Sequence, residues 1–311
     1  MFGNLSTPLV WALGGLYALL LTANLIVWIL QRRSLKDLNE LAARVKSWWV
    51  MIIIFTLAIA VSTQLSIIFF ALVSFLAFKE YLAMTTTRRA DRRVIFWAFL
   101  AIPVQFYWVA TGWYGMFIIF IPVYMFLLLP TRMVLIGETK GFLKATGTLH
   151  WGLMTTVFSI SHAAYLLVLP SSTVTPAGGA GLLFFLVFLS QFNDVAQYTW
   201  GKLFGKHPVV PKVSPKKTVE GLLGGVLTTT LTAWLIAPYL TPLTDGWAAL
   251  AGLIIGLSGF FGDVVISAIK RDIGVKDSGN LIPGHGGIMD RVDSLTFTAP
   301  LFFHYLYYLS Y

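Results

Sequence analysis

The stretch that decides the fold reads Trp247-Ala-Ala-Leu-Ala-Gly-Leu-Ile-Ile-Gly-Leu-Ser-Gly-Phe-Phe-Gly-Asp263-Val-Val-Ile-Ser267-Ala-Ile-Lys270-Arg271. Residues 247–268 are mostly apolar, with Asp263 as their one charged residue, and about 20 such residues suffice for a helix to cross the hydrocarbon core of a bilayer. A charge at that depth costs roughly 3 kcal/mol or more and usually marks a functional site. The stretch therefore predicts a transmembrane helix that carries a functional carboxylate.

The composition extends this prediction to the whole chain. Of 311 residues, 57% are hydrophobic and 11% charged, and the mean hydropathy is +0.79, whereas soluble domains carry about 25% charged residues. Long apolar runs recur along the sequence. We predict an all-α, polytopic bundle with ten spans, at residues 8–30, 48–63, 64–79, 94–110, 113–130, 151–169, 180–200, 220–238, 247–268 and 294–310.

The basic residues predict the orientation. All 22 Lys and Arg side chains fall in the five loops that follow the odd-numbered spans. By the positive-inside rule these loops are cytoplasmic, and both termini lie outside. The same rule explains the net charge of +9 without nucleic acid, so we expect the lipid bilayer and no nucleic acid among the partners. The absence of cysteine excludes disulfides, thiolate metal sites and Cys nucleophiles.

The chemistry is unevenly distributed, which suggests two parts. Residues 1–150 carry few polar groups within their spans, and their acids (Asp37, Glu40, Glu80, Asp91 and Glu138) lie in basic loops. This part is predicted to be a scaffold. Residues 151–311 are predicted to be the catalytic region, with cytoplasmic loops at 201–218 and 269–293. The segment from Arg32 to Lys46 has an amphipathic pattern that suits a connector on the membrane surface.

Two acids lie at membrane depth in the catalytic region, Asp194 and Asp263. Asp263, Ser267 and Lys270 are spaced i, i+4 and i+7, so they share one helix face. Both spans run inward, so a cytosolic ligand can reach both acids. Two alternatives remain open. The acids could only join helices through hydrogen bonds or ion pairs, or they could form a cation or proton relay in a transporter.

The loop before the eighth span contains Ser214-Pro-Lys216-Lys217-Thr. Ser followed by Pro is typical of a helix N-cap with Pro at the first helical position, which predicts Lys216 and Lys217 in the first turn. The helix dipole disfavours cations there, so the pattern suggests a bound anion such as phosphate. The alternative is a simple positive-inside anchor.

A glycine-rich turn, Pro283-Gly-His285-Gly286-Gly287, precedes Asp290-Arg291-Val-Asp293. Glycines let backbone amides approach an anion closely, and His285 could bind a phosphate oxygen or donate a proton. Asp290 and Asp293 are expected to share a helix face. Oxygen ligands without Cys or a His cluster favour Mg²⁺ over Zn²⁺, and this layout is typical of Mg²⁺-assisted phosphoryl or nucleotidyl transfer.

These residues resemble the phosphatidate cytidylyltransferases, also called CDP-diacylglycerol synthases, from about residue 190 to 295. The family signature is Ser-x-x-Lys-Arg, Lys-Asp, Pro-Gly-His-Gly-Gly and Asp-Arg-x-Asp. It is filled at every position, by Ser267, Lys270, Arg271, Lys276, Asp277, Pro283, Gly284, His285, Gly286, Gly287, Asp290, Arg291 and Asp293. An upstream motif, Ser-Pro-Lys-Lys-Thr-x-Glu-Gly, is matched by residues 214–221.

The resemblance implies that CTP and phosphatidic acid, or a related lipid phosphate, react with Mg²⁺ to give CDP-diacylglycerol and pyrophosphate. It implies metal ligands at Asp263, Asp290 and Asp293, with Asp194 a further candidate and a second cation possible. The residues expected to act in catalysis are Asp263, Lys270, Arg271, His285, Asp290 and Asp293. Those expected to bind substrate phosphates are Lys216, Lys217, Lys276, Gly286, Gly287 and Arg291.

One departure concerns the substrate. The family usually has Asp-x-x-Ala-Tyr in the seventh span, and here Gln197 replaces the Ala. The reaction type is unaffected, but the lipid acceptor is left open. A CTP-dependent lipid kinase is the nearer alternative to nucleotidyl transfer, and a transporter the more distant one. The location implied is the bacterial cytoplasmic (inner) membrane with the active site facing the cytoplasm, and a homodimer is a further expectation.

Overall fold

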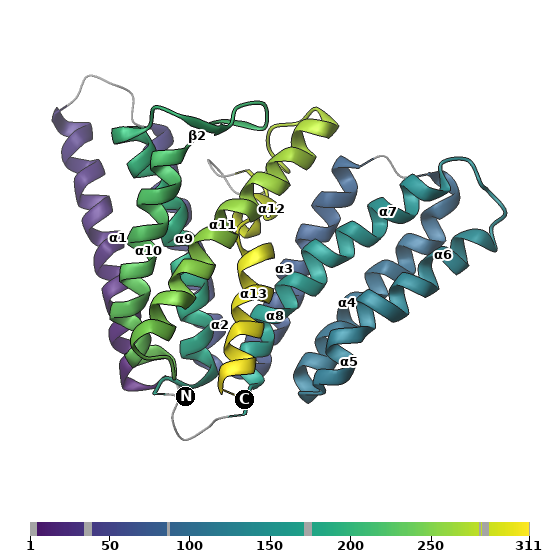
Figure 1. Cartoon of the computed structure of the whole chain (residues 1–311), viewed down its shortest axis with the longest axis horizontal. Coiled ribbons are helices and arrows are strands. Elements are labelled where there is room, and N and C mark those ends of the chain that lie inside the picture. The colour runs from purple at the N-terminus through teal and green to yellow at the C-terminus, as the bar shows by residue number, and fades with distance from the viewer. Residues whose placement is uncertain are drawn as a thin grey trace.

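The computed structural model describes residues 5–33, 39–85, 88–170, 176–279, 281 and 286–310, and most of them are helical (Figure 1). The longest helices are α1 (Thr7–Arg33), α2 (Asn39–Val61), α3 (Thr63–Met84), α4 (Arg92–Thr111), α9 (Gly178–Phe204), α10 (Val219–Leu240) and α11 (Asp245–Ile273). The shorter ones are α5 (Tyr114–Ile119), α6 (Phe126–Val134), α7 (Phe142–Leu153), α8 (Ser159–Tyr165), α12 (Met289–Val292) and α13 (Leu295–Ser310).

Short irregular helices connect several of these elements. A π-helical segment, η2 (Phe120–Met125), joins α5 to α6, and another, η3 (Met154–Phe158), joins α7 to α8. The 3₁₀ segments η1 (Arg89–Asp91) and η4 (Leu166–Val168) precede α4 and follow α8. Each π segment therefore continues one membrane crossing rather than separating two.

The predicted polytopic bundle is confirmed. In the described ranges, nine helical stretches are long and apolar enough to cross a membrane, judged by length and composition. They correspond to the first nine predicted spans, although most are longer than predicted. The tenth predicted span is α13, which has 16 residues and at 1.5 Å per residue is about 24 Å long. α13 packs between α8 and α11, so it lies inside the bundle.

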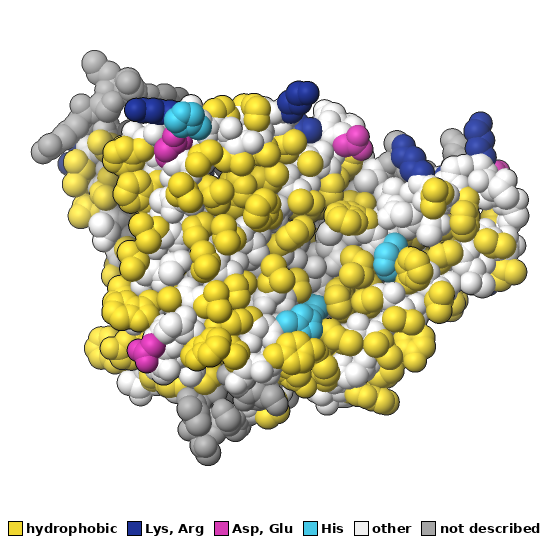
Figure 2. All heavy atoms as spheres, in the orientation of Figure 1, with side chains coloured by type: hydrophobic (Ala, Val, Ile, Leu, Met, Phe, Trp, Pro, Cys, Tyr) yellow, Lys and Arg dark blue, Asp and Glu magenta, His cyan; other side chains and the backbone are white. Residues whose placement is uncertain are grey.

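The basic side chains of the described residues gather at one end of the bundle. Figure 1 places the beginning of α1 and the end of α13 at the same end. On the face drawn in Figure 2, Lys and Arg side chains lie along the opposite edge, and hydrophobic side chains cover most of the surface between the two ends. This separation agrees with the predicted partition of basic loops. The side of the membrane on which each end lies stays a prediction.

The helices of the catalytic region pack on one side of the bundle, and α4 to α7 extend as an arm on the other (Figure 1). Glycines set the contact between α9 and α10. A Cβ on Gly221 would lie 2.8 Å from the backbone oxygen of Gln197 and 3.1 Å from the Cα of Gly201. Small residues allow such close approach between membrane helices, and here they hold the beginning of α10 against the end of α9.

The loop between α9 and α10 corrects one prediction. Residues 214–217 do not begin a helix. They belong to strand β2 (Ser214–Thr218), which pairs antiparallel with β1 (Pro208–Val210). Lys216 and Lys217 therefore lie on a hairpin rather than in a first helical turn, and the argument for an anion at that helix N-terminus is wrong.

Local chemistry explains the hairpin. Proline disfavours a helical backbone conformation in the residue before it, and Pro215 therefore keeps Ser214 extended. The cap is supplied four residues later, where the Thr218 hydroxyl accepts a hydrogen bond of 3.1 Å from the N–H of Gly221. Thr is a good N-cap residue, so α10 begins at Val219.

Other boundaries also differ from the predictions. The loop predicted at 201–218 is shorter, since α9 continues to Phe204. The loop predicted at 269–293 is shorter as well, since α11 continues to Ile273 and ends at Gly274, whose φ of +84° suits a helix C-cap. The predicted surface helix from Arg32 to Lys46 is wrong at its ends, which belong to α1 and α2; residues 34–38 lie outside the described ranges.

Candidate active site

Two of the predicted acids come from neighbouring long helices. Asp194 lies on α9, and its Oδ2 accepts a hydrogen bond of 2.8 Å from the Ser294 hydroxyl, while its Oδ1 is buried and has no hydrogen-bond partner among the described residues. Asp263 lies on α11, and its Oδ1 accepts a bond of 3.1 Å from Ser267 one turn later. The predicted shared face of Asp263 and Ser267 is confirmed.

The hairpin contributes a lysine to this group. Lys217 Nζ lies 2.7 Å from Asp263 Oδ2, and its charge also acts on Asp194. The same ammonium lies 4.9 Å from the centre of the Phe260 ring. Lys217 is thus held over the acids by α11, although the strand that carries it was predicted as a helix.

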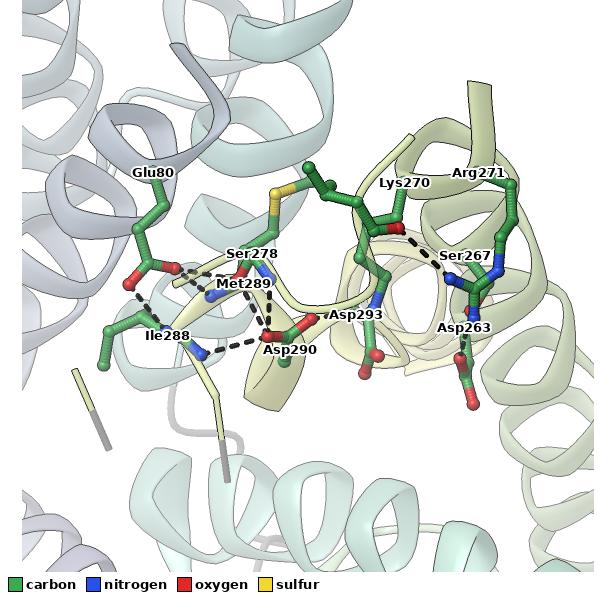
Figure 3. Close-up of polar contacts among 12 residues, drawn as sticks. Glu80, Asp263, Ser267, Lys270, Arg271, Ser278, Ile288, Met289, Asp290 and Asp293 are labelled. Atoms are coloured by element: carbon green, nitrogen blue, oxygen red, sulfur yellow. Dashed lines mark hydrogen bonds and ion pairs between the residues drawn. The ribbon is translucent and has the colours of Figure 1, made fainter. Parts of the chain in front are cut away.

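Asp290 has a different set of partners, which Figure 3 shows. Its Oδ1 accepts a bond of 2.7 Å from Lys270 Nζ. Its Oδ2 accepts bonds from the N–H of Ser278 at 2.8 Å and of Gly287 at 3.0 Å, and lies 3.0 Å from the Ser278 hydroxyl. Burial alone would raise the pKa of Asp290, but the hydrogen bonds from Lys270 and Gly287 outweigh it, so the pKa lies below its ordinary value.

Asp293 lies deep in the same region. Its Oδ1 accepts a bond of 2.8 Å from the N–H of Ser294. Burial raises the pKa of Asp293 well above its ordinary value, and the charges of Asp263 and Asp194 raise it further. Asp194, Asp263 and Asp293 therefore form one group of interacting carboxylates, whereas Asp290 is committed to Lys270 and to backbone N–H groups.

These acids do not form a compact metal cage. Within the ranges that the structure describes, no three His, Cys, Asp or Glu residues come close enough together to hold a metal ion as they stand. Two features nevertheless suit a cation. The charges of the three carboxylates act on one another, and Asp194 Oδ1 is a buried oxygen for which the described residues provide no donor.

The remaining predicted bases differ in position. Lys270 is buried, whereas Lys216, Arg271 and Lys276 are exposed around the site. Arg271 Nε donates a bond of 3.3 Å to the Val213 carbonyl, which ties the hairpin to the end of α11. Arg291 Nε is a buried donor for which the described atoms provide no acceptor.

The glycine turn falls partly outside the described residues, because residues 282–285, including His285, are not among them. Gly286 has a φ of +80°, and a Cβ there would lie 2.5 Å from Asp290 Oδ2. Together with the bond from Gly287 to Asp290, this gives both glycines an internal role. Their assignment to substrate phosphate stays a prediction.

Gln197, the unusual residue, lies among the site residues. Its Oε1 is 3.5 Å from Lys217 Nζ, and its Nε2 is 3.5 Å from the carbonyl oxygen of Gly256. The side chain is buried where α9 meets α10 and α11. Its polar end therefore touches the lysine that contacts Asp263.

One acid at the site was missed from the sequence. Glu80, on α3 of the predicted scaffold, accepts hydrogen bonds from the backbone N–H groups of Ile288 and Met289 (Figure 3). In the sequence it follows an apolar span within a basic stretch, which is typical of a solvated loop acid. The available signal was its place near a helix C-terminus, where the dipole disfavours an acid.

Comparisons with known proteins identify the family of the chain. The sequence matches the cytidylyltransferase family over residues 42–309. It is 47% identical over 301 residues to the uncharacterised protein YnbB of Escherichia coli strain K12, covering 96% of this chain and 99% of that protein. It is 45% identical over 122 residues to the phosphatidate cytidylyltransferase of Mycobacterium leprae strain TN, covering 39% of each chain.

A third relative is the phosphatidate cytidylyltransferase of Synechocystis sp. strain ATCC 27184, which is 50% identical over 114 residues, covering 36% of this chain and 39% of that protein. The matches to the two named enzymes thus span about two fifths of each. The family match, by contrast, spans most of this chain, including the site described above. This protein therefore belongs to the cytidylyltransferase family.

Proposed function

We propose that this protein transfers the cytidylyl group of CTP to the phosphate of a membrane lipid, phosphatidic acid or a related lipid phosphate, and releases pyrophosphate. The observation that carries the proposal is the gathering of carboxylates from α9, α11 and the end of α12 with Lys217 and Lys270, at the basic end of a membrane bundle. In a cytidylyltransferase, such a site suits two phosphorylated substrates, one of them embedded in the bilayer.

The reaction needs little covalent chemistry from the protein. An oxygen of the lipid phosphate forms a bond to the α-phosphorus of CTP, and the bond from that phosphorus to the bridging oxygen of the β-phosphate breaks. Pyrophosphate carries away the electron pair. The attacking oxygen is already anionic, so no strong general base is required. Catalysis then consists of positioning two anions and offsetting their repulsion.

The basic side chains suit that task. Lys217 and Lys270 lie among the carboxylates, and the buried Nε of Arg291 has no acceptor among the described atoms. Lys216, Arg271 and Lys276 are exposed around the site, where a triphosphate arriving from the water phase would meet them. We assign the inner bases to the reacting phosphates and the outer bases to the remainder of CTP.

We also propose that the reaction depends on Mg²⁺, held by Asp263 and Asp293 with Asp194 as a further ligand. Carboxylate oxygens are the ligands that Mg²⁺ prefers, and the buried Oδ1 of Asp194, which has no donor within the described ranges, supports the fit. When bound, the ion would offset charge that develops on the phosphates. Asp290 remains a candidate ligand, although in the present arrangement it pairs with Lys270.

The lipid tails need an apolar surface next to these acids. A groove of about 390 Å³ lies between α11 and α13, lined by Ile254, Leu257, Ser258, Phe261, Phe297 and Leu301. Two of its residues are close in sequence to the acids, since Phe261 precedes Asp263 and Phe297 follows Asp293. We propose that an acyl chain lies there, so that the lipid enters from the bilayer while CTP enters from the cytoplasm.

Two labels of one substrate test the proposed reaction. Purified protein in detergent is given phosphatidic acid and Mg²⁺ with CTP labelled either at the α-phosphate or at the γ-phosphate. Cytidylyl transfer places only the α-label in the lipid, and EDTA abolishes the product. The γ-label in the lipid would instead identify a lipid kinase. If neither label enters any lipid phosphate and the protein does not bind CTP, the proposal of an enzymatic function is wrong.

A further inference from the structure

Glu80 connects the N-terminal part of the chain to the catalytic turn. Its Oε1 accepts a hydrogen bond of 2.9 Å from the N–H of Ile288, and its Oε2 accepts one of 2.9 Å from the N–H of Met289. The Ser278 hydroxyl lies 3.1 Å from Oε2. These partners are 198 to 209 residues away in the sequence, so one carboxylate joins both ends of the turn to α3.

The turn is shaped to receive this carboxylate. A Cβ on Gly287 would overlap Glu80 Oε2, and a Cβ on Gly279 would lie 3.2 Å from Glu80 Oε1. Any larger residue at Gly287 would therefore displace Glu80 or the turn. The second glycine of the Gly-Gly pair thus has a reason to be glycine within the protein itself.

The position of Glu80 is unfavourable for α3 alone. The residue lies one turn before the end of the helix, where the partial negative charge of the C-terminus disfavours an acid. The carboxylate oxygens of Glu80 instead accept hydrogen bonds from N–H groups at the beginning of α12. These N–H groups have no acceptor within that helix. The contact to the turn accounts for an acid at a place where the local helix would favour a base.

The contacts continue from Glu80 to the buried ion pair (Figure 3). Ser278 lies between the two acids, because its hydroxyl is 3.1 Å from Glu80 Oε2 and 3.0 Å from Asp290 Oδ2. Asp290 in turn binds Lys270 at 2.7 Å. Glu80 therefore acts on Asp290 through residues 278 and 287–289.

We infer that Glu80 is a positioning residue for the transfer reaction. By holding residues 278 and 287–289 against α3, it fixes where Asp290, Lys270 and Asp293 lie relative to Asp263. This inference rests on the proposed function, and it gives part of the predicted scaffold a role in the site. A displacement of about 1 Å in a catalytic group can lower turnover a hundredfold. The hydrogen bonds of Glu80 to residues 278, 288 and 289 are therefore expected to have a large effect on the rate.

The first test measures the turn without any substrate. Because the chain contains no cysteine, Leu281→Cys gives a single site for a nitroxide spin label; Leu281 is exposed, so the label is accessible. The mobility of the label is compared by electron paramagnetic resonance in the Glu80 and Glu80→Gln backgrounds. Gln keeps the length but replaces one acceptor by a donor, so we expect a more mobile label.

Glu138→Gln is the matched control. Glu138 lies in the loop between α6 and α7 and accepts a bond from the N–H of Lys140 in its own loop. We expect no change at Leu281→Cys in this background. Ser278→Ala, which removes the hydroxyl between Glu80 and Asp290, is a second way to weaken the contact between Glu80 and the turn. Equal mobility of the label in the Glu80, Glu80→Gln and Ser278→Ala proteins would overturn the inference.

The second test separates positioning from stability. Turnover is measured per folded molecule, with unfolded protein removed by size exclusion. We expect Glu80→Gln to lower kcat about tenfold and Glu80→Asp to lower it further, because the shorter side chain cannot reach both N–H groups. The KM for CTP should change little. Unchanged kcat in folded Glu80→Gln would reduce Glu80 to a stabilising contact.

The two tests distinguish a failure of the proposed function from a failure of the inference about Glu80. If the wild-type protein transfers no cytidylyl group to any lipid, the proposed function is wrong, yet the label still reports whether Glu80 orders the turn. If the wild-type protein is active and the label is indifferent to Glu80, only the positioning role is lost.

Discussion

Lys217 Nζ lies 2.7 Å from Asp263 Oδ2, and this contact joins strand β2 to helix α11. The two side chains are 18% and 24% exposed, so the pair is partly shielded from solvent but remains open to an incoming ligand. A cation that binds Asp263 would weaken its hold on Lys217, and the ammonium would then be available to a phosphate. The relationship links the metal-binding and the phosphate-binding parts of the proposed site.

The change Asp263→Asn tests the metal part of the site. We expect turnover to fall by at least about a hundredfold, since removing one preorganised electrostatic group typically costs that much. Stability should change little, because the Asn oxygen can still accept the hydrogen bond from Ser267. Turnover with labelled CTP and thermal unfolding in detergent measure the two effects. Normal turnover would exclude Asp263 as a metal ligand.

Asp290→Asn is expected to behave differently. It should abolish turnover and also destabilise the protein, because Lys270 would stay buried without its anion, and breaking a buried pair in this way costs about 3–5 kcal/mol. Unfolding in denaturant, compared with Asp263→Asn, measures the difference. Asp293→Asn is the control for burial, since Asp293 is also buried but forms no ion pair of this kind with the described residues. An Asp290→Asn protein as stable as Asp263→Asn would contradict this account.

The features that could be predicted from the sequence are those with local causes. Apolar runs specify membrane helices, and clustered Lys and Arg specify loops on one side, so the spans were found even where their ends were misplaced. The shared face of Asp263 and Ser267 follows from helix geometry alone. The same geometry placed Lys270 beside Asp263, but its long side chain instead reaches Asp290, a choice that depends on where α12 lies.

The features that were missed depend on distant partners. Ser214-Pro215 fits both a helix start and an extended strand, and the pairing of Pro208–Val210 with β2 decides between them. Glu80 shows the same limit more strongly, because its partners are about 200 residues away. No local pattern distinguishes an acid that caps a remote turn from one that faces water.

The contact between α9 and α10 predicts the effect of Gly221→Ala. The new methyl group would lie 2.8 Å from the backbone oxygen of Gln197, and a backbone atom cannot rotate away. We expect the helices to separate and the unfolding free energy to fall by about 1–3 kcal/mol, the usual cost of overpacking. Gly147→Ala on α7, where nothing lies within 4 Å, is the control. Equal stability of the two variants would show that the contact is not tight.

The groove between α11 and α13 predicts a change in acyl-chain preference. Leu301→Trp would fill part of it, so kcat/KM for long-chain phosphatidic acid should fall more than kcat/KM for a short-chain analogue. Leu253→Trp is the control, because Leu253 is exposed on α11 but does not line the groove. Equal losses for both lipids, or equal effects of both variants, would place the acyl chain elsewhere.

Gln197 predicts how the lipid acceptor is chosen. Both of its polar contacts are long, at 3.5 Å, so each contributes less than about 1 kcal/mol. Gln197→Ala should therefore change turnover with a good acceptor by less than about fivefold. Its main effect should be on selectivity, because the amide that touches Lys217 would be replaced by the small side chain usual in phosphatidate cytidylyltransferases.

Initial rates with phosphatidic acid and other lipid phosphates measure this selectivity, with Tyr198→Phe on the exposed side of α9 as the control. A shift of the rate ratio toward phosphatidic acid in Gln197→Ala alone would assign acceptor choice to this position, whereas an unchanged ratio would leave Gln197 only the task of holding Lys217 beside Asp263.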